Sequence, residues 1–243
     1  MGNYNLKYKP YGEKTLLIEW PSQIDECILY DIINLQKIVE SNLAGIVVES
    51  VPAYQSLALF YDPSVISFEG LTHQVTLIYR NTDNDQLFQP KLWHIPVCYD
   101  LSFGIDLEYL SNITGLRINS IIELHIATVY TVYFIGFLPG FLYLGGLPET
   151  LHAPRKSSPR PKVLKGAVAI GGSQTGIYPM ENHGGWNIIG NSPLHFLELE
   201  KHPPVFASAG DKVKFFPIEL TEHAKILQEV NDGNCKLLRE TIL

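Results

Sequence analysis

The sequence lacks the cysteine spacing of a disulfide framework or a structural zinc site. Its three cysteines, Cys27, Cys98 and Cys235, lie far apart and form no CxxC pair. Disulfide-rich secreted domains and zinc sites use paired or closely spaced cysteines. The histidines are also too scattered to indicate a metal site. We therefore expect no bound metal, no disulfides and a cytoplasmic protein.

Long apolar runs and a positive net charge are missing as well. No segment approaches the roughly 18 consecutive apolar residues that cross a bilayer. The first fourteen residues contain no apolar core of the kind that a secretory signal needs. The formal net charge is −7, which disfavours nucleic acid as a partner. We expect neither membrane insertion nor nucleic-acid binding.

The common signatures of nucleotide and serine-hydrolase sites are absent too. The sequence contains no GxxxxGK[ST], and no GxGxxG opens a helix, so a conventional phosphate-binding loop is not expected. The residues around Ser173 do not form a nucleophile elbow. A serine hydrolase is therefore weakly supported.

The amino-terminal half has the pattern of an α+β domain. Residues 14–20 read as a strand, and apolar residues at spacings of three or four then predict a helix over 24–39. Ser22 with Asp25 gives a capping-box-like helix start. Two extended segments and a second helix over 65–78 follow. This order is most of a ferredoxin-like fold, which one final strand would complete.

A polar segment separates this half from the rest. Residues 81–86 are six polar residues in a row, which is typical of a linker. We therefore predict an α+β domain over 1–86 and a second domain over 87–243. The first domain contains no nucleophile, metal cluster or phosphate loop, so it is interpreted as a scaffold or docking module.

The second domain is predicted to be mainly β. A strand over 92–99 and two short helices, separated by Gly115, precede a strand over 129–136. Short extended pieces broken by glycine and proline then continue to Pro217, which is typical of a barrel or sandwich. Helical periodicity returns only in a short carboxy-terminal tail, over 220–230.

One stretch concentrates the glycines. Eleven of the nineteen lie between Gly136 and Gly190, interspersed with aromatic and β-branched residues that disordered segments lack. Such a stretch should be folded, with glycines where backbones crowd. The Gly171 to Gly176 turn, which includes Gln174 and Thr175, could present backbone N–H groups to a carboxylate, although a simple hairpin fits the same pattern.

The same stretch contains a local excess of positive charge. Residues 150–180 include no Asp or Glu but five cations, namely Arg155, Lys156, Arg160, Lys162 and Lys165. Arginine can bind a carboxylate or phosphate through two hydrogen bonds, and the neighbouring prolines stiffen the backbone around Arg155 and Arg160. The pattern indicates an anion site, with a solvated basic loop as the alternative.

Several blocks in order carry a family resemblance. YFIGFLPGFLYLGGLP, PRKSSPRPKVLKGAVAIGGSQTGIYP and GGWNIIGNSP closely resemble the allophanate hydrolase subunit 1 family, which includes the B subunit of 5-oxoprolinase and the sporulation kinase inhibitor. The blocks are also similar to a carboxyltransferase subdomain of urea carboxylase, of the kind called subdomain C and D. IPVCYDLSFGIDL and the Leu124, His125 pair extend the resemblance upstream, so that it covers about residues 92–217.

The resemblance implies a fold and an activity. The fold would be a cyclophilin-like β-barrel behind a small ferredoxin-like domain. The activity would be that of one subunit of an ATP-dependent amidohydrolase complex. This subunit would be inactive alone and would work with the A and C subunits to cleave 5-oxoproline to glutamate. ATP, with Mg²⁺, would act at the level of the complex.

The resemblance also implies residue roles. Arg155 and Arg160 would neutralise negative charge that develops during the reaction, and Gln174 and Thr175 would join them as catalytic residues. The residues expected to bind the small amide or lactam substrate are Gly172, Gly176, Tyr178, His125 and Phe137.

Two other functions stay open, and several positions depart from the family pattern. The protein could instead be a non-enzymatic inhibitor of a sensor histidine kinase, or a carboxyltransferase-type subunit that acts on a urea-like amide. The departures are Asp100, Ser102, Leu164, Asn182, His183 and Asn191. An acid absent at Ser102 and an arginine absent at Asn191 would indicate an altered substrate or a regulatory role.

Overall fold

The computed structural model describes residues 4–81, 88–234 and 238–241. The chain divides into two compact units, Met1–Gln89 and Pro90–Leu243, and each is described by itself. The predicted boundary after residue 86, like most of the predicted linker, lies outside the described residues. No helix of the described residues is long and apolar enough to cross a membrane.

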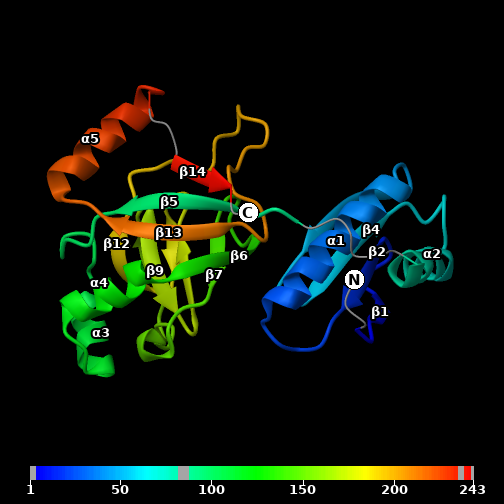
Figure 1. Cartoon of the computed structure of the whole chain (residues 1–243), viewed down its shortest axis with the longest axis horizontal. Coiled ribbons are helices and arrows are strands. Elements are labelled where there is room, and N and C mark those ends of the chain that lie inside the picture. Colours follow the sequence, from blue (N-terminus) through cyan, green and yellow to red (C-terminus); the bar gives the residue numbers. More distant parts are fainter. Residues whose placement is uncertain (1–3, 82–87, 235–237, 242–243) are drawn as a thin grey trace. The chain divides into compact units, whose positions relative to one another are not determined.

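The first unit is a four-stranded antiparallel sheet covered by two helices (Figure 1). Its elements, in chain order, are β1 (Lys7–Pro10), β2 (Thr15–Glu19), α1 (Glu26–Asn42), β3 (Val47–Pro52), β4 (Ser56–Tyr61) and α2 (Phe68–Asn81). The strand order is β1-β2-β4-β3. Apolar side chains from both helices and from β2 and β4 form one core, which includes Leu16, Ile32, Leu57 and Val75.

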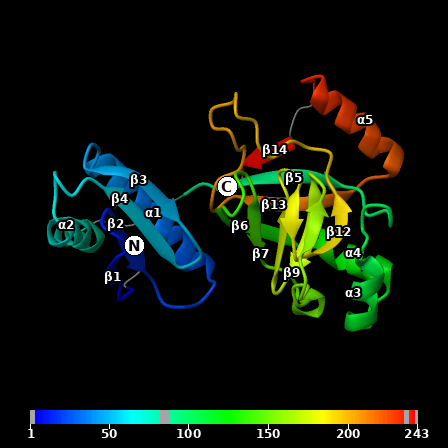
Figure 2. The same cartoon turned by 180° about the vertical axis from the view of Figure 1, so that it is seen from behind.

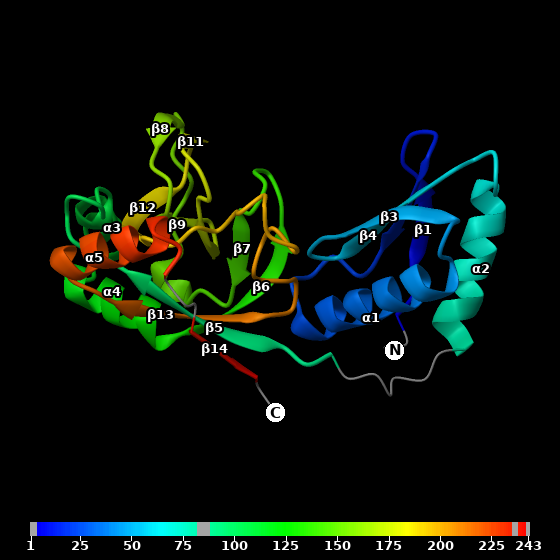
Figure 3. The same cartoon turned by 90° about the horizontal axis from the view of Figure 1, so that it is seen from above.

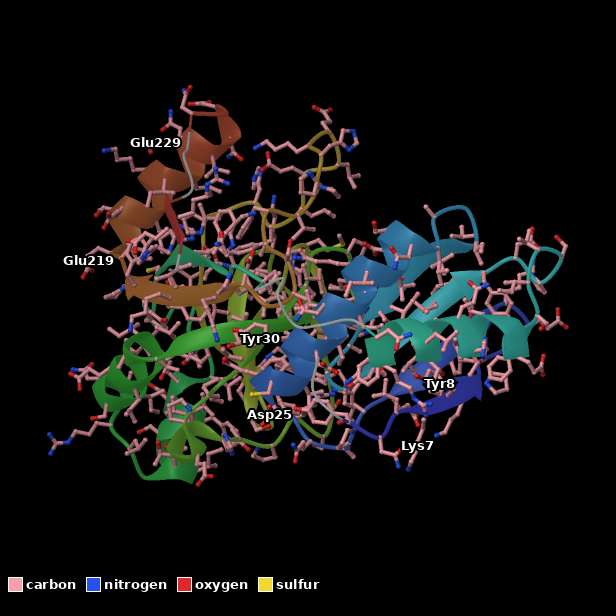
Figure 4. The ribbon with its side chains drawn as sticks, turned by 45° about the vertical axis from the view of Figure 1, so that its right-hand side comes forward. Lys7, Tyr8, Asp25, Tyr30, Glu219 and Glu229 are labelled. Atoms are coloured by element: carbon pink, nitrogen blue, oxygen red, sulfur yellow. The ribbon has the colours of Figure 1, made fainter. Side chains whose placement is uncertain are left out.

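Two local expectations for this unit need correction. Asp25 alone caps α1, since its side chain accepts hydrogen bonds from the backbone N–H groups of Cys27 and Ile28. Figure 4 shows Asp25 at the start of this helix. The edge next to β2 is occupied by Lys7–Pro10, from before the first predicted strand, and not by a strand following the second helix. The segment KYKP is too short and polar to show period-two alternation, so sequence reasoning missed it.

The second unit is a rolled eight-stranded sheet with helices and a small two-stranded sheet attached (Figures 1 and 2). Its first elements are β5 (Lys91–Val97), α3 (Leu107–Thr114), α4 (Ile118–Ala127), β6 (Val129–Ile135), β7 (Leu142–Gly145) and the 3-10 turn Glu149–Leu151. Those that follow are β8 (Arg160–Val163), β9 (Ala167–Gly171), β10 (Gln174–Ile177), β11 (Asn182–Gly184), β12 (Asn187–Asn191), β13 (Lys212–Pro217), α5 (Leu220–Asn231) and β14 (Leu238–Thr241).

The large sheet closes on itself. Its strand order is β12-β9-β10-β7-β6-β13-β5-β14. The ends of β5 and β12 meet through a pair of backbone hydrogen bonds between Cys98 and Asn191, at 2.8 and 3.0 Å. Because β14 pairs with the first half of β5, the edge strand β12 meets only the far end of β5, and the sheet rolls round into a barrel-like arrangement.

The barrel interior is apolar, and a second apolar cluster lies beneath the glycine-rich segment. Alternating residues of β5, β6, β7, β9 and β13 fill the interior, among them Ile95, Val132, Leu144, Ile170 and Phe215. The smaller cluster contains Phe141, Tyr178 and Trp186. Val163 of β8 also belongs to it, and Figure 3 shows the two-stranded sheet β8–β11 near β9 and β12. This second cluster positions the candidate site.

Candidate functional site

A pocket of about 240 Å³ opens in the second unit where the glycine-rich blocks meet. Its walls come from the loop after β6, from β7, from the segment before β8 and from the segment around β11. The lining residues are Phe137, Phe141, Tyr143, Arg155, Lys156, Pro159, Tyr178, His183, Gly184, Gly185 and Trp186. Five of these lining residues are Phe, Tyr or Trp. None of the eleven lining residues carries a carboxylate.

The aromatic wall is built from edge-to-face contacts. Phe141 meets Trp186 with ring centroids 5.5 Å apart at an angle of 88°, and meets Tyr178 at 5.0 Å and 89°. Aromatic pairs prefer this geometry because the positive ring edge faces the negative ring face. The rings are therefore fixed before any ligand arrives.

Two glycines make room for this wall. A Cβ added at Gly171 would lie 2.5 Å from the Trp186 ring, and one at Gly184 would lie 2.3 Å from the Tyr178 hydroxyl. Both distances are shorter than any van der Waals contact, so only glycine fits. The glycine richness of the sequence is explained here by close packing under the pocket.

The two phenols of the pocket are held in their neutral form. Burial raises the pKa of Tyr178, against the opposing effects of a backbone hydrogen bond from Trp186 and of nearby positive charge. Burial likewise raises the pKa of Tyr143, while Arg155 opposes the shift. Both hydroxyl groups can donate a hydrogen bond at neutral pH.

Phe137 and His183 form the rim. Phe137 has a left-handed backbone, with φ of 68°, and its side chain is 59% exposed. Non-glycine residues rarely adopt this conformation, and those that do are often found at ligand sites. The Phe137 ring meets the His183 ring edge-to-face at 6.0 Å.

Arg155 supplies positive charge to the pocket. Its guanidinium lies 5.5 Å from the centre of the Trp186 ring. Among the described residues, no carboxylate lies within ion-pair distance of Arg155, whose side chain is exposed. A guanidinium held over an aromatic face keeps its hydrogen-bond donors available for an anion.

Arg160 is held differently. Its Nη2 donates to Asp106 Oδ1 at 2.5 Å, and Lys156 Nζ lies 2.8 Å from the same oxygen. The other oxygen, Oδ2, accepts a hydrogen bond from the backbone N–H of Ile188 at 2.8 Å. The predicted pair of anion-binding arginines is therefore divided: Arg155 faces the pocket, while Arg160 is ion-paired beside it.

Asp106 is the centre of this cluster. It lies just before α3 and is 2% exposed. Burial alone would raise the pKa of Asp106, but hydrogen bonds from Arg160, Lys156 and the Ile188 backbone outweigh that effect and lower it. The carboxyl group is therefore ionised at neutral pH.

His125, on α4, and Thr175, on β10, belong to a different environment, the buried core of the second unit. The Nε2 atom of His125 is 3.0 Å from Thr175 Oγ1, its Nδ1 atom is 2.8 Å from the Tyr99 hydroxyl, and His125 is fully buried. Burial lowers the pKa of His125 to about 3. Neither side chain lines the pocket, and their contacts form a neutral hydrogen-bonded network in the core.

The predicted turn is a β-hairpin. Gln174 is opposite Gly171 in the β9–β10 pair, and Gly172 has φ of +66°. The backbone N–H of Gly172 donates to the Ala153 carbonyl at 2.7 Å. A Cβ at Gly176 would lie 2.8 Å from the Leu142 carbonyl. Gln174, Gly172 and Gly176 do not line the pocket, so the hairpin interpretation of the pattern describes their geometry.

Two of the family departures have local structural contacts. Ser102 donates its hydroxyl and its backbone N–H to Asp100, which stabilises the turn before α3. Asn191 donates to the Lys165 carbonyl at 2.8 Å and is 2.8 Å from Nε2 of His223, on α5. Among the described residues, no group of three or more His, Cys, Asp or Glu side chains is arranged to hold a metal ion.

Comparison with known proteins identifies the family. The model of the carboxyltransferase domain, subdomain C and D, matches residues 6–207. The chain belongs to this family. It is 35% identical to the B subunit of 5-oxoprolinase from Bacillus subtilis (strain 168) in an alignment of 230 positions that covers 90% of this chain and 96% of that protein. The family resemblance drawn from the glycine-rich blocks is confirmed.

Solved structures agree with the fold. A conserved uncharacterized protein from Pyrococcus horikoshii is 39% identical, with a TM-score of 0.53 over 89% of this chain and 100% of that one. The urea amidolyase of K. lactis is 18% identical, with a TM-score of 0.83 over 98% of this chain and 16% of that one, which shows the fold alone. Several of these structures are longer chains, of which this one covers 40% or less.

Sequence reasoning missed the site roles of Asp106 and Trp186, and it placed Lys156 in the predicted anion site without identifying its acidic partner. Asp106 is in the segment GIDLEYL, whose pattern predicts only a helix start. Its charge has no partner nearby in sequence, and its partners lie 50 and 54 residues downstream. One signal in the sequence could have indicated this role. Asp106 precedes an apolar helix face, and the same chain contains a basic segment without acids that could supply its partners.

Proposed function

We propose that this chain is the B subunit of an ATP-dependent 5-oxoprolinase complex and that the pocket around Arg155 binds the carboxylate of the lactam substrate. One observation carries the proposal. A guanidinium with no carboxylate partner among the described residues lies in an aromatic-walled pocket whose lining residues include no carboxylate. The similarity to the B subunit of 5-oxoprolinase from Bacillus subtilis, over most of both chains, supports it.

The pocket suits a small, flat, singly charged molecule. Arg155 would bind the carboxylate through two parallel hydrogen bonds. The Trp186 and Phe141 rings would cover the lactam ring, and the neutral Tyr178 and Tyr143 hydroxyls would be able to donate to the lactam carbonyl. Holding the substrate in one orientation is the contribution that these residues make to catalysis.

The residues of this pocket do not fit ATP. The pocket volume of about 240 Å³ is below the range of roughly 300–1,000 Å³ common for cofactor sites. No lining residue carries a carboxylate for Mg²⁺, and the sequence has no phosphate-binding loop. We therefore assign nucleotide chemistry to the partner A and C subunits.

The proposal includes the finer fold. The first unit is a ferredoxin-like domain whose edge strand comes from the amino-terminal side, because β2-α1-β3-β4-α2 has the ferredoxin-like order. The second unit is a cyclophilin-like barrel. The two domains correspond to the two compact units. A cyclophilin-like fold does not by itself imply prolyl isomerase activity.

Reconstitution tests the function. The protein is co-purified with its cognate homologues of the A and C subunits, and ATP hydrolysis is followed with 5-oxoproline, with 2-pyrrolidinone and with neither. Only 5-oxoproline should stimulate hydrolysis, because 2-pyrrolidinone lacks the carboxylate that Arg155 would bind. The isolated chain should be inactive towards both.

A verified complex without 5-oxoproline-dependent turnover would refute the proposal. Inhibition of a sensor histidine kinase by the isolated chain would then favour the regulatory function. Carboxylation of a urea-like amide by the complex would favour a carboxyltransferase function.

A further inference from the structure

We infer that Asp106 is a positioning residue that sets the charge selectivity of the pocket, so that it accepts monocarboxylates and rejects dicarboxylates. The inference rests on the proposed function, because it treats the Arg155 pocket as the substrate site. It adds a specificity determinant outside the pocket lining.

The first step is the geometry of the Asp106 carboxylate. Oδ1 is 2.5 Å from Arg160 Nη2 and 2.8 Å from Lys156 Nζ, and Oδ2 accepts the Ile188 N–H at 2.8 Å. The Asp106 backbone N–H in turn donates to the Ile188 carbonyl at 2.9 Å. Asp106 is thus bonded to residues that adjoin two of the wall segments, the one that contains Arg155 to Pro159 and the one that contains Trp186.

The second step is what these bonds position. Lys156 and Arg160 enclose the segment that contains Pro159, and Ile188 follows Trp186 by two residues. The backbone N–H of Lys156 also donates to the Gly185 carbonyl at 2.7 Å. Arg155, at the start of the first segment, is held over the Trp186 ring of the second.

The third step is the charge balance. Three cations, Arg155, Lys156 and Arg160, lie at or beside the pocket, and Asp106 is ion-paired with the last two. The Lys156 ammonium is further held 4.7 Å from the Tyr109 ring, on α3. Of these three cations, Arg155 is the one that has no carboxylate partner among the described residues, and its single charge matches one carboxylate.

Selectivity follows from electrostatics. A second carboxylate in the pocket would need Lys156 or Arg160 to leave Asp106, and a buried carboxylate that loses one of its two cationic partners is destabilised. Without the Asp106 charge, Lys156 would be free to bind that second carboxylate. Specificity here arises from making the wrong ligand costly, as well as from attracting the right one.

The test uses two flat probes that differ by one charge, benzoate and isophthalate, with affinities measured by calorimetry on the full chain at pH 8. The wild type should bind benzoate more tightly. Asp106→Asn should shift the affinity ratio towards isophthalate by about tenfold, as expected for one unit charge at a partly exposed site. Lys156→Gln should shift the ratio the opposite way.

The double variant separates charge from scaffolding. Asp106→Asn combined with Lys156→Gln removes one charge of each sign, so the ratio should return to near that of the wild type. If Asp106 only held the structure together, the affinity ratio of the double variant would differ from that of the wild type as much as the ratio of Asp106→Asn does. If Asp106→Asn does not fold, the opposite shift in Lys156→Gln still decides, because the Lys156 side chain is at the pocket surface.

Two results would overturn the inference: wild type that binds neither probe, or an affinity ratio that is unchanged in the two single variants, including the case in which both probes are weakened equally. The proposed function is judged separately, by lactam-dependent ATP hydrolysis in the complex. Intact charge selectivity without lactam turnover would refute only the proposed function. Lactam turnover without the ratio shifts would refute only the role of Asp106.

Discussion

At the scale of single residues, the pocket depends on which charged groups have partners. Arg155 has none among the described carboxylates, and its guanidinium lies on the Trp186 ring. Arg160 is ion-paired with a buried acid. The two arginines lie in similar sequence contexts, but their substitution should have different effects. Substitution of Arg155 should reduce activity alone, whereas substitution of Arg160 should also reduce stability.

Arg155→Ala should reduce 5-oxoproline-dependent ATP hydrolysis of the reconstituted complex by at least about tenfold, since a charge-assisted hydrogen bond contributes roughly 1.5–3 kcal/mol. The thermal unfolding midpoint should be unchanged, because the side chain is exposed. The control is Arg117→Ala, an exposed arginine of the same unit outside the pocket. Equal turnover in Arg155→Ala and wild type would contradict the assigned site.

His125 gives a prediction about pH. Burial lowers the pKa of His125 to about 3 from its usual value of 6.5. Between pH 6.5 and pH 3, His125 is therefore protonated in the unfolded chain and neutral in the folded chain. Its contribution to stability is complete above pH 6.5 and decreases as the pH falls towards 3. The loss should be about 2 kcal/mol between pH 7 and pH 5.

Urea denaturation at several pH values measures this effect. His125→Gln should be less stable than wild type at neutral pH, but should lose about 2 kcal/mol less on acidification to pH 5. His73→Gln, an exposed histidine of α2, should keep the wild-type pH dependence. Identical pH slopes in wild type and His125→Gln would show that His125 does not titrate as its burial requires.

At the scale of elements, the closure of the barrel is the critical feature. Strands β5 and β12 meet at the bridge between Cys98 and Asn191. Gly190 lies beside this bridge, and a Cβ there would be 2.7 Å from the Cys98 carbonyl oxygen. The obstructing atom belongs to the backbone, so the closure itself would have to move.

Gly190→Ala should therefore destabilise the protein by roughly 3 kcal/mol, the upper end of the range for overpacking. Gly172→Ala is the matched comparison, because a Cβ there meets nothing within 4 Å and only its φ of +66° is unfavourable. That cost should be about 1 kcal/mol. Chemical denaturation measures the loss of stability in both variants, which should be larger for Gly190→Ala than for Gly172→Ala. An equal or smaller loss for Gly190→Ala would show that the strands at the bridge shift freely to accept a methyl group.

At the scale of the whole molecule, each compact unit has an apolar core of its own. The first unit buries residues of β2, β4, α1 and α2 around Leu16 and Ile32, and the second fills its barrel around Tyr130 and Phe215. Cores that share no residues can fold independently.

The segment 90–243 produced alone should give one cooperative thermal transition in calorimetry and should retain benzoate binding, because all the pocket residues belong to it. The segment 1–89 should fold alone but bind no benzoate. A segment 90–243 without a cooperative transition would show that its barrel depends on the first unit.

The element types and the family could be predicted from the sequence, while the closing contacts could not. Periodicity identified the helices that became α1 and α2, and glycine–proline punctuation indicated a barrel or sandwich. These local patterns could not reveal that β1 occupies the sheet edge or that Cys98 pairs with Asn191, since pairing between distant strands leaves no local pattern.

By itself, the sequence determined a glycine-packed aromatic segment with a basic insert, because local crowding and charge are properties of neighbouring residues. Only the tertiary structure decided which of these basic residues pair with an acid. Arg155, Lys156 and Arg160 look alike along the chain, but Asp106 reaches Lys156 and Arg160 and not Arg155. Charge pairing acts through distance in space, so the fold, and not the order of residues, left the Arg155 guanidinium facing the pocket.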